Sequence, residues 1–145
     1  MDMGLNLKLF HVILVMTSIF KVTLAGWNTK NTLVIQNSFR SNANSLYVHC
    51  KSDGDGHDLG EHWLAAGQKL SWSFHLSFWS STSYHCYVQW ANKKKYFVAF
   101  NDSIYKCCDN NESLTWFVGN RALLALNQKK DGKNRFIIQL DWLDH

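Results

Sequence analysis

The sequence predicts an all-β fold, a small antiparallel β-sandwich with hairpin connections that disulfides stabilise. Hydrophobic residues recur at every second position along most of residues 26–145, an alternation typical of strands that bury one face. No long stretch shows a 3.6-residue repeat bounded by helix caps. The seven tryptophans and nine phenylalanines of the 145-residue chain favour two packed antiparallel sheets.

The N-terminal segment predicts a secretory signal peptide over residues 1–25. The apolar run Leu9–Phe20 follows a short charged head, and it is shorter than the roughly 20 residues that span a bilayer. Thr23 and Ala25 supply the small residues expected before a cleavage site. A buried helix or strand is the weaker interpretation, because the head, the apolar run and the small residues occur in signal-peptide order. Cleavage would leave residues 26–145 as one domain with no membrane insertion.

Eight strands are expected in that domain. Each candidate segment is rich in β-branched and aromatic residues and is bounded by polar turns. In the last segment two sets of side chains are expected to point to opposite faces, one being Phe136, Ile138, Leu140 and Trp142 and the other Ile137, Gln139 and Asp141. The expected strands are Asn31–Gln36, Ser45–Lys51, Lys69–His75, Ser83–Trp90, Lys95–Asn101, Ser113–Val118, Ala122–Asn127 and Arg135–Trp142.

The charge pattern argues against a nucleic-acid partner. The formal net charge is +4, and the lysines do not gather into the basic stripe that such partners require. Lys93 and Lys94 lie between two expected strands, Lys95 begins the second of them, and Lys129-Lys130 lie in another polar segment. They are therefore interpreted as solvated turns.

Four cysteines predict two disulfides in a secreted domain. They are Cys50, Cys86, Cys107 and Cys108, and three pairings are open. Zinc binding is not expected, because the spacing contains no C-x-x-C pair. The sequons that begin at Asn101 and Asn111 predict N-glycosylation, which fits passage through the secretory pathway.

The stretch HCKSDGDGHDLGEHW, residues 49–63, gathers acidic residues, histidines and a cysteine. An EF-hand loop that begins at Asp53 would need an oxygen ligand at the position of His57 and a glycine at the position of Asp58. It would also need a glutamate at the position of Leu64. His57, His62 and Cys50 lack a recognised zinc spacing. We expect no metal and no cofactor, and interpret the segment as a polar connection after a strand.

Histidines are the candidates for acid–base catalysis. A ribonuclease with His49 or His85 as the base and a lysine for the phosphate would be the sharpest enzyme hypothesis. Nothing in the spacing selects it, and His49, His75 and His85 all lie in expected strands. We therefore expect no catalytic residues and no enzymatic activity.

Several blocks together resemble the plant self-incompatibility protein S1 family, whose members are also called S-protein homologues. The resemblance covers nearly all of residues 26–145, and HCKS followed by DLG-x-H and W-x-F is its most specific part. It implies a secreted β-sandwich with disulfides; in the best-understood branch, stigma-secreted ligands are recognised by a pollen receptor and trigger a calcium signal that stops incompatible pollen. The blocks are Val34-Ile35-Gln36-Asn37, Leu46-Tyr47-Val48-His49-Cys50-Lys51-Ser52, Asp58-Leu59-Gly60-Glu61-His62, Gly67, Trp72-Ser73-Phe74, Ser77-Phe78-Trp79, Cys86 and Trp90.

One departure from the family pattern affects the disulfides. The family carries its last cysteine two residues before the tryptophan that aligns with Trp116, where this chain has Leu114. Cys107 and Cys108 would have to replace it. The resemblance then leads to the hypothesis of Cys86–Cys107 and Cys50–Cys108 bridges.

The function expected from the sequence is that of a secreted, monomeric ligand for a cell-surface protein receptor, with specificity in the loops of a rigid sandwich. A secreted hydrolase such as a ribonuclease, and a defence protein without a receptor, are the alternatives. The candidate loops are Ser52–Asp58, Ala91–Lys94, Asn101–Glu112 and Gln128–Asn134. Their candidate recognition residues are Asp53, Asp55, His57, Asp58, Lys93, Lys94, Asp109, Asn110, Lys130 and Asp131.

Overall fold

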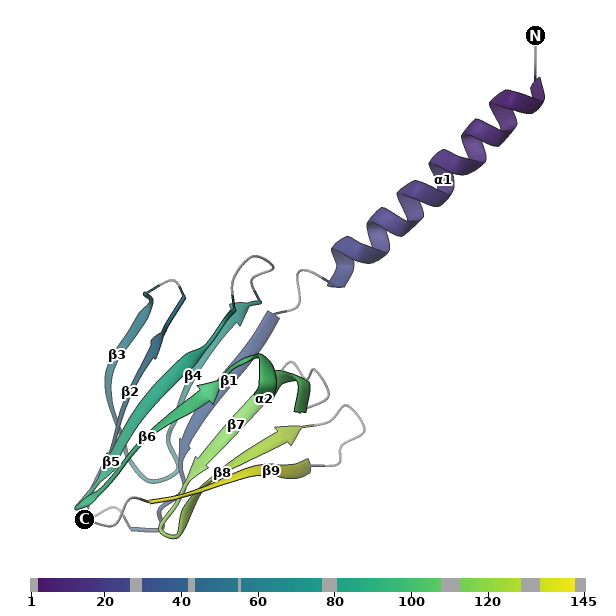
Figure 1. Cartoon of the computed structure of the whole chain (residues 1–145). Coiled ribbons are helices and arrows are strands. Elements are labelled where there is room, and N and C mark those ends of the chain that lie inside the picture. The colour runs from purple at the N-terminus through teal and green to yellow at the C-terminus, as the bar shows by residue number, and fades with distance from the viewer. Residues whose placement is uncertain are drawn as a thin grey trace.

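A computed structural model describes residues 3–26, 30–41, 44–54, 56–76, 81–107, 113–128 and 134–142 of the chain. Helix α1 (Met3–Gly26) projects away from the strands (Figure 1), and its side chains over residues 3–18 are exposed. Among the described residues, no helix combines the length and apolar character that crossing a membrane requires. The signal peptide and its cleavage stay predictions.

The predicted β-sandwich is confirmed (Figure 1). Strand neighbours are antiparallel except for β1 and β7, which are parallel. Sheet A, in the order β4-β1-β7-β8-β9, contains β1 (Lys30–Asn37), β4 (Lys69–His75), β7 (Ser113–Val118), β8 (Ala122–Gln128) and β9 (Asn134–Asp141). Sheet B, in the order β3-β2-β5-β6, contains β2 (Leu46–Ser52), β3 (Asp58–Leu64), β5 (Tyr84–Trp90) and β6 (Lys93–Phe100).

Beyond α1, two elements of the described residues were not predicted from the sequence, strand β3 and the short helix α2 (Asp102–Cys107). β3 lies at the edge of sheet B, and Gly60 within it has a φ of 79° that favours glycine. Its polar sequence lacks a strand pattern, so that pairing with β2 decides its conformation. In α2 the Asn101 side-chain oxygen accepts the Ile104 N–H at 2.8 Å, which caps the first turn.

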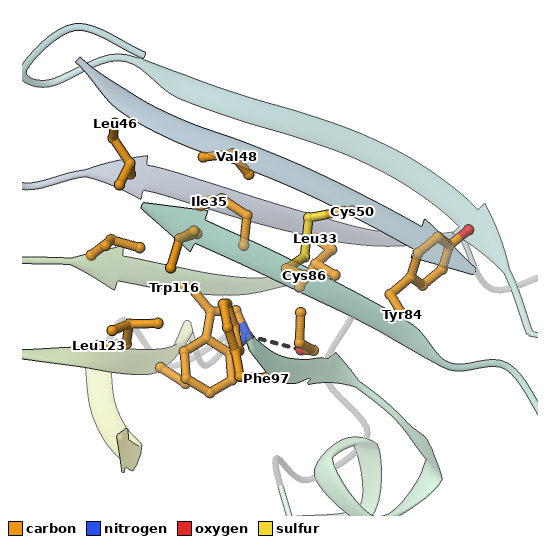
Figure 2. Packing of buried hydrophobic residues seen from close by; sticks show 14 of the residues in the cluster. Leu33, Ile35, Leu46, Val48, Cys50, Tyr84, Cys86, Phe97, Trp116 and Leu123 are labelled. Atoms are coloured by element: carbon orange, nitrogen blue, oxygen red, sulfur yellow. Dashed lines mark hydrogen bonds between the residues drawn. A yellow bond between two sulfur atoms is a disulfide. The ribbon is translucent and has the colours of Figure 1, made fainter. Parts of the chain in front are cut away.

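The core lies between the two sheets and follows the predicted alternation (Figure 2). In β1, Leu33 and Ile35 are buried, and Val34 between them is half-buried on the outer face. Trp116 of β7 is fully buried; its indole Nε1–H donates to the Ala99 carbonyl oxygen at 2.8 Å, and β6 carries Ala99. That hydrogen bond joins sheet A to sheet B across the core.

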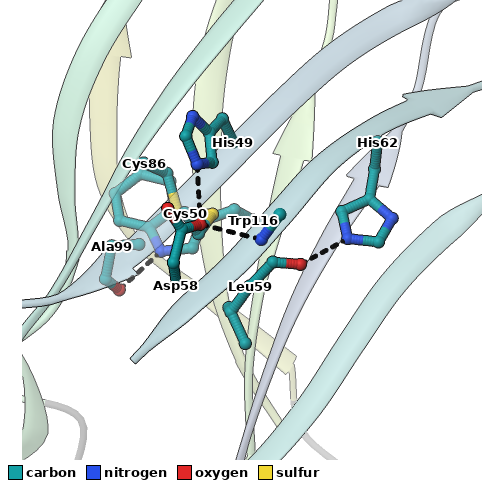
Figure 3. Close-up of a disulfide and its surroundings, with 9 residues drawn as sticks. His49, Cys50, Asp58, Leu59, His62, Cys86, Ala99 and Trp116 are labelled. Atoms are coloured by element: carbon teal, nitrogen blue, oxygen red, sulfur yellow. Dashed lines mark hydrogen bonds and ion pairs between the residues drawn. A yellow bond between two sulfur atoms is a disulfide. The ribbon is translucent and has the colours of Figure 1, made fainter. Parts of the chain in front are cut away.

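The predicted disulfide pairings are wrong. Cys50 of β2 is bonded to Cys86 of β5 (Figure 3), and a sulfur forms only one such bond, so neither Cys86–Cys107 nor Cys50–Cys108 exists. The physical reason is the strand register, because Cys50 and Cys86 stand directly opposite each other with their Cα atoms 4.1 Å apart. Cys107 ends α2, but its side chain and all of Cys108 lie outside the described residues.

A buried asparagine ties the two sheets together where β1 ends. The Asn37 side-chain amide donates to the Leu64 carbonyl oxygen at 2.8 Å, and its oxygen accepts the Phe39 N–H at 3.0 Å. Its backbone pairs with Gly67 and Gln68, and Gly67 takes a φ of 79° that favours glycine. The Asn37 and Gly67 of the family resemblance therefore have structural roles in joining β1 to the β3–β4 connection.

Candidate recognition face

The structure places the predicted recognition residues at different ends of sheet B. Asp53 and His57 lie in the β2–β3 connection and Asp58 opens β3, whereas Lys93 and Lys94 open β6 after the β5–β6 turn. Figure 1 shows these two connections at opposite ends of the sandwich. The other predicted residues, Asp55, Asp109, Asn110, Lys130 and Asp131, lie outside the described residues.

Asp58 is held by three groups at the base of the β2–β3 connection. Its Oδ1 lies 2.7 Å from His49 Nε2 (Figure 3) and accepts the Gly60 N–H at 2.8 Å. Its Oδ2 lies 3.2 Å from Lys51 Nζ. The Gly60 N–H is the largest cause that lowers the pKa of the Asp58 carboxyl to about 2, followed by the hydrogen bond from His49. The HCKS and DLG blocks thus form one hydrogen-bonded cluster.

Asp53 is held in a similar way at the other side of the same connection. Its Oδ2 accepts the Ser83 hydroxyl at 2.8 Å and lies 2.7 Å from His85 Nδ1, at ion-pair distance but without hydrogen-bond alignment. Its N–H donates to the Ser83 carbonyl oxygen at 3.2 Å. Within the described part of the chain, no group of three or more histidine, cysteine or acidic residues could hold a metal ion. These carboxylates shape the connection.

The lowered pKa of Asp58 leads to a prediction on pH dependence. Because the ionised carboxylate is favoured in the folded state, its contribution to stability is complete above the ordinary pKa of 3.8 and is lost as the pH falls through about 2. The wild-type protein should therefore unfold at a higher urea concentration than Asp58→Asn at pH 4 and above. This difference should shrink toward zero as the pH falls to 2 and below.

Urea titrations at several pH values between 5 and about 1.5 would measure the difference. The matched control is Asp141→Asn, which removes an exposed carboxylate from β9 in the other sheet. If the wild type and Asp58→Asn differ by the same amount at every pH, the carboxylate is not held as described.

The outer face of sheet B carries one aromatic side chain on each of its four strands. We call this set the aromatic row, and its members are Trp63 (β3), Tyr47 (β2), Tyr87 (β5) and Tyr96 (β6). Trp63 stands opposite Tyr47 and Tyr87 stands opposite Tyr96. The ring centroids are 4.9 Å apart for Tyr47 and Trp63, and 6.0 Å apart for Tyr47 and Tyr87. The row therefore crosses the whole width of the sheet.

The two ends of the aromatic row are exposed to solvent. Trp63 is 67% and Tyr96 is 63% exposed, and beyond α1 no other large apolar side chain of the described residues is exposed. Exposed aromatic side chains that lie on one face are typical of interaction surfaces. This face is not predicted from the sequence, because recognition residues are expected in polar loops. The signal that the sequence contains is Tyr47, an aromatic residue at an outward position between buried Leu46 and Val48.

Polar groups border the row. Glu61 stands opposite His49. Burial is the largest cause that raises the pKa of the Tyr47 hydroxyl, followed by the charge of Glu61 and a hydrogen bond with it. The Tyr87 hydroxyl donates to Gln89 Oε1 at 3.2 Å, and the His85 ring stacks on Tyr96 with centroids 5.7 Å apart. The face thus combines a central set of aromatic rings with a polar, chargeable rim, which is the arrangement of a protein interface.

Comparison with known proteins identifies the family of the chain. The family model described as plant self-incompatibility protein S1 matches residues 32–142. The chain is 40% identical over 92 residues to S-protein homolog 24 of Arabidopsis thaliana, which covers 61% of this chain and 57% of that protein. S-protein homolog 21 of the same plant is 33% identical over 82 residues, 56% of this chain and 57% of the relative.

The chain thus spans little more than half the length of these two relatives. A longer match is to self-incompatibility protein S1 of Papaver rhoeas, which is 30% identical over 127 residues, 85% of this chain and 86% of that protein. The family match over residues 32–142 includes the cluster around Asp58 and strand residues of both sheets. The chain therefore belongs to the plant self-incompatibility protein S1 family.

Proposed function

We propose that the protein is a secreted recognition ligand that binds a cell-surface protein through the outer face of sheet B. The observation that carries this proposal is the aromatic row with its exposed ends, Trp63 and Tyr96. The name of the Papaver rhoeas relative, self-incompatibility protein S1, supports a role in recognition between cells. We further propose that the protein acts as a monomer, without catalysis, and carries glycans at Asn101 and Asn111.

The ring geometry favours a protein partner over a polysaccharide. A sugar chain stacks on aromatic rings that lie in one plane. In the aromatic row the Tyr47 and Trp63 rings are inclined by 64°, and the Tyr47 and Tyr87 rings by 67°. Such edge-to-face rings present an uneven surface, which fits the side chains of a protein better than a flat chain of sugar rings.

The rigidity of the face also supports binding. Its two central strands are joined by the Cys50–Cys86 disulfide on the opposite side of the sheet, so that the row is held on a fixed scaffold. Preorganised tyrosine and tryptophan side chains lose little conformational entropy when they bind. The row should therefore form the energetic centre of the interface, and the neighbouring connections should add specificity.

The test is saturable binding of the fluorescently labelled protein to intact plant cells. Replacing Trp63 and Tyr96 together with alanine is expected to weaken binding by about 30-fold or more, as for two interface residues that lie at a hot spot. Pretreatment of the cells with protease should abolish binding, because the proposed partner is a protein. The control variant Lys69→Ala changes an exposed side chain of sheet A and should bind as the wild type does.

Two outcomes would contradict the proposal. Wild-type affinity in the Trp63→Ala/Tyr96→Ala variant would show that the partner binds elsewhere. Binding that survives protease but is lost after digestion of cell-wall polysaccharide would show that the partner is not a protein.

A hydrolase remains the second candidate, and one observation favours it. Lys51 stands opposite His85, and His49 is two residues away on β2, so two histidines and a lysine share the outer face. Each histidine contacts an aspartate, His49 with Asp58 and His85 with Asp53. A purified protein that cleaves RNA, and loses this activity while staying folded as His49→Ala, would establish this alternative.

A further inference from the structure

A second surface feature lies at the end of the sandwich where the β1–β2 and β7–β8 connections meet. It is an open cleft of about 960 Å³. The β1–β2 connection forms one side and the β7–β8 turn forms another, and Leu124 and Gln139 of sheet A complete it. Its lining residues are separate from the aromatic row and from the connection between β2 and β3.

Two arginines give this cleft a positive charge. Arg40 comes from the β1–β2 connection and Arg121 from the β7–β8 turn, and both are exposed. Among the described residues neither guanidinium has a carboxylate within ion-pair distance, and no described residue of the cleft lining is acidic. Asp141, near the lining, accepts a hydrogen bond from the Gln139 amide at 3.4 Å.

A third cation holds the turn that carries Arg121. Lys93 Nζ donates to the backbone and side-chain oxygens of Asn120, and lies 6.0 Å from the centre of the Trp142 ring. The N–H of Gly119 donates to the Ala122 carbonyl oxygen at 3.1 Å, which closes the turn. Arg121 therefore lies on a turn that these hydrogen bonds hold, and Arg40 lies on a connection that buried Phe39 anchors.

We propose that this cleft binds an acidic peptide segment of a protein partner. Guanidinium groups bind carboxylates through two parallel hydrogen bonds, and the side chains of Asn120, Gln139 and Ser38 offer further polar groups for a peptide backbone. Leu124 offers an apolar surface to an aliphatic side chain of the peptide. The proposal does not depend on the aromatic row and stands if that row has another role.

Ring packing favours a peptide over an acidic sugar at this cleft. The aromatic rings in its lining are Phe39 and Trp90, and they stack on each other with centroids 4.0 Å apart and planes inclined by 7°. Phe39 is buried, and the Trp90 Nε1–H donates to the Asn44 carbonyl oxygen at 3.1 Å. The faces that they turn toward each other are thus occupied, so a sugar ring has less aromatic surface on which to stack.

Titration calorimetry with a short synthetic peptide of glutamate and leucine tests the proposal. Arg40→Gln/Arg121→Gln is expected to weaken binding about tenfold relative to wild type, as expected for two exposed ion pairs. The affinity of Arg40→Lys/Arg121→Lys for the peptide should lie between those of the wild type and the glutamine variant, because lysine keeps the charge and loses the paired hydrogen bonds. The control Lys94→Gln/Lys95→Gln removes two charges from β6 outside the cleft lining and should stay within about twofold of wild type.

Circular dichroism and thermal unfolding would first confirm that each variant is folded. Amide shifts of Arg40, Asn120 and Gln139 in NMR spectra on peptide addition are the expected second sign of binding. An equal loss of affinity in the control would overturn the proposal, since it would show attraction by net charge alone. Tighter arginine-dependent binding of polygalacturonate or inorganic phosphate than of the peptide would also overturn it.

Discussion

Replacing Cys50 and Cys86 together with alanine is expected to lower the free energy of unfolding by about 4 kcal/mol. The disulfide links residues that are 36 positions apart in sequence, and in the chain-entropy model a loop of this length restricts the unfolded state by about that amount. For a domain of this size the loss is a large fraction of the total stability. Urea unfolding under non-reducing conditions would measure it as a lower midpoint.

Two controls separate the bond from the packing of the sulfur atoms. In reductant the free energy of unfolding of the wild-type protein should fall almost to that of the double variant. Only the packing of two buried thiols then distinguishes the two proteins. Peptide mapping of the non-reduced protein should give a linked pair that contains Cys50 and Cys86. A peptide that links Cys86 to Cys107 would contradict the structure.

The difference between the predicted and observed disulfides shows what a sequence pattern can and cannot provide. Alternation locates strands, because burial of one face is a local property of each strand. The partner of each cysteine depends on which strands become neighbours, and β2 and β5 are brought together across β3 and β4. The hydrophobic pattern of a single chain does not contain this long-range pairing.

The secondary structure shows the same limit. All eight predicted strands are present, with ends that agree or differ by at most two residues, because each has an apolar face that must pack on the other sheet. β3 is not predicted because Asp58, Gly60 and Glu61 interrupt its alternation of apolar and polar residues. Its strand conformation depends on hydrogen-bonded pairing with one side of β2. An edge strand of this kind takes its conformation from its neighbour more than from its own composition.

The candidate site was only partly accessible from the sequence. The sequence predicts a polar connection through Asp53 and Asp58, but the structure places only Asp53 in the β2–β3 connection and starts β3 at Asp58. The hydroxyl, histidine and backbone groups that hold these two carboxylates come from residues brought close by strand pairing. The aromatic row needs four strands in register before it exists. Trp63 lies on the strand that was not predicted, and so its outward direction could not be deduced.

Replacing Trp116 with alanine is the second substitution expected to have a large effect on stability, and it should lower the free energy of unfolding by about 4 kcal/mol. The indole is fully buried, packs edge to face on Phe97 with centroids 4.8 Å apart, and donates its N–H to Ala99. Removing it opens a cavity between the sheets and leaves the Ala99 carbonyl without this donor. Thermal and urea unfolding monitored by far-ultraviolet circular dichroism would measure the loss.

Trp116→Phe separates the two causes, because phenylalanine retains most of the ring volume and lacks the N–H. A loss of about 2 kcal/mol is expected for this variant, since a buried carbonyl left without its donor costs about 1 to 3 kcal/mol. The matched control is Trp63→Ala, which removes an exposed tryptophan from the outer face and should change stability by about 0.5 kcal/mol or less. If Trp116→Phe is as stable as the wild type, the hydrogen bond between the sheets contributes little, and packing alone holds them together at this point.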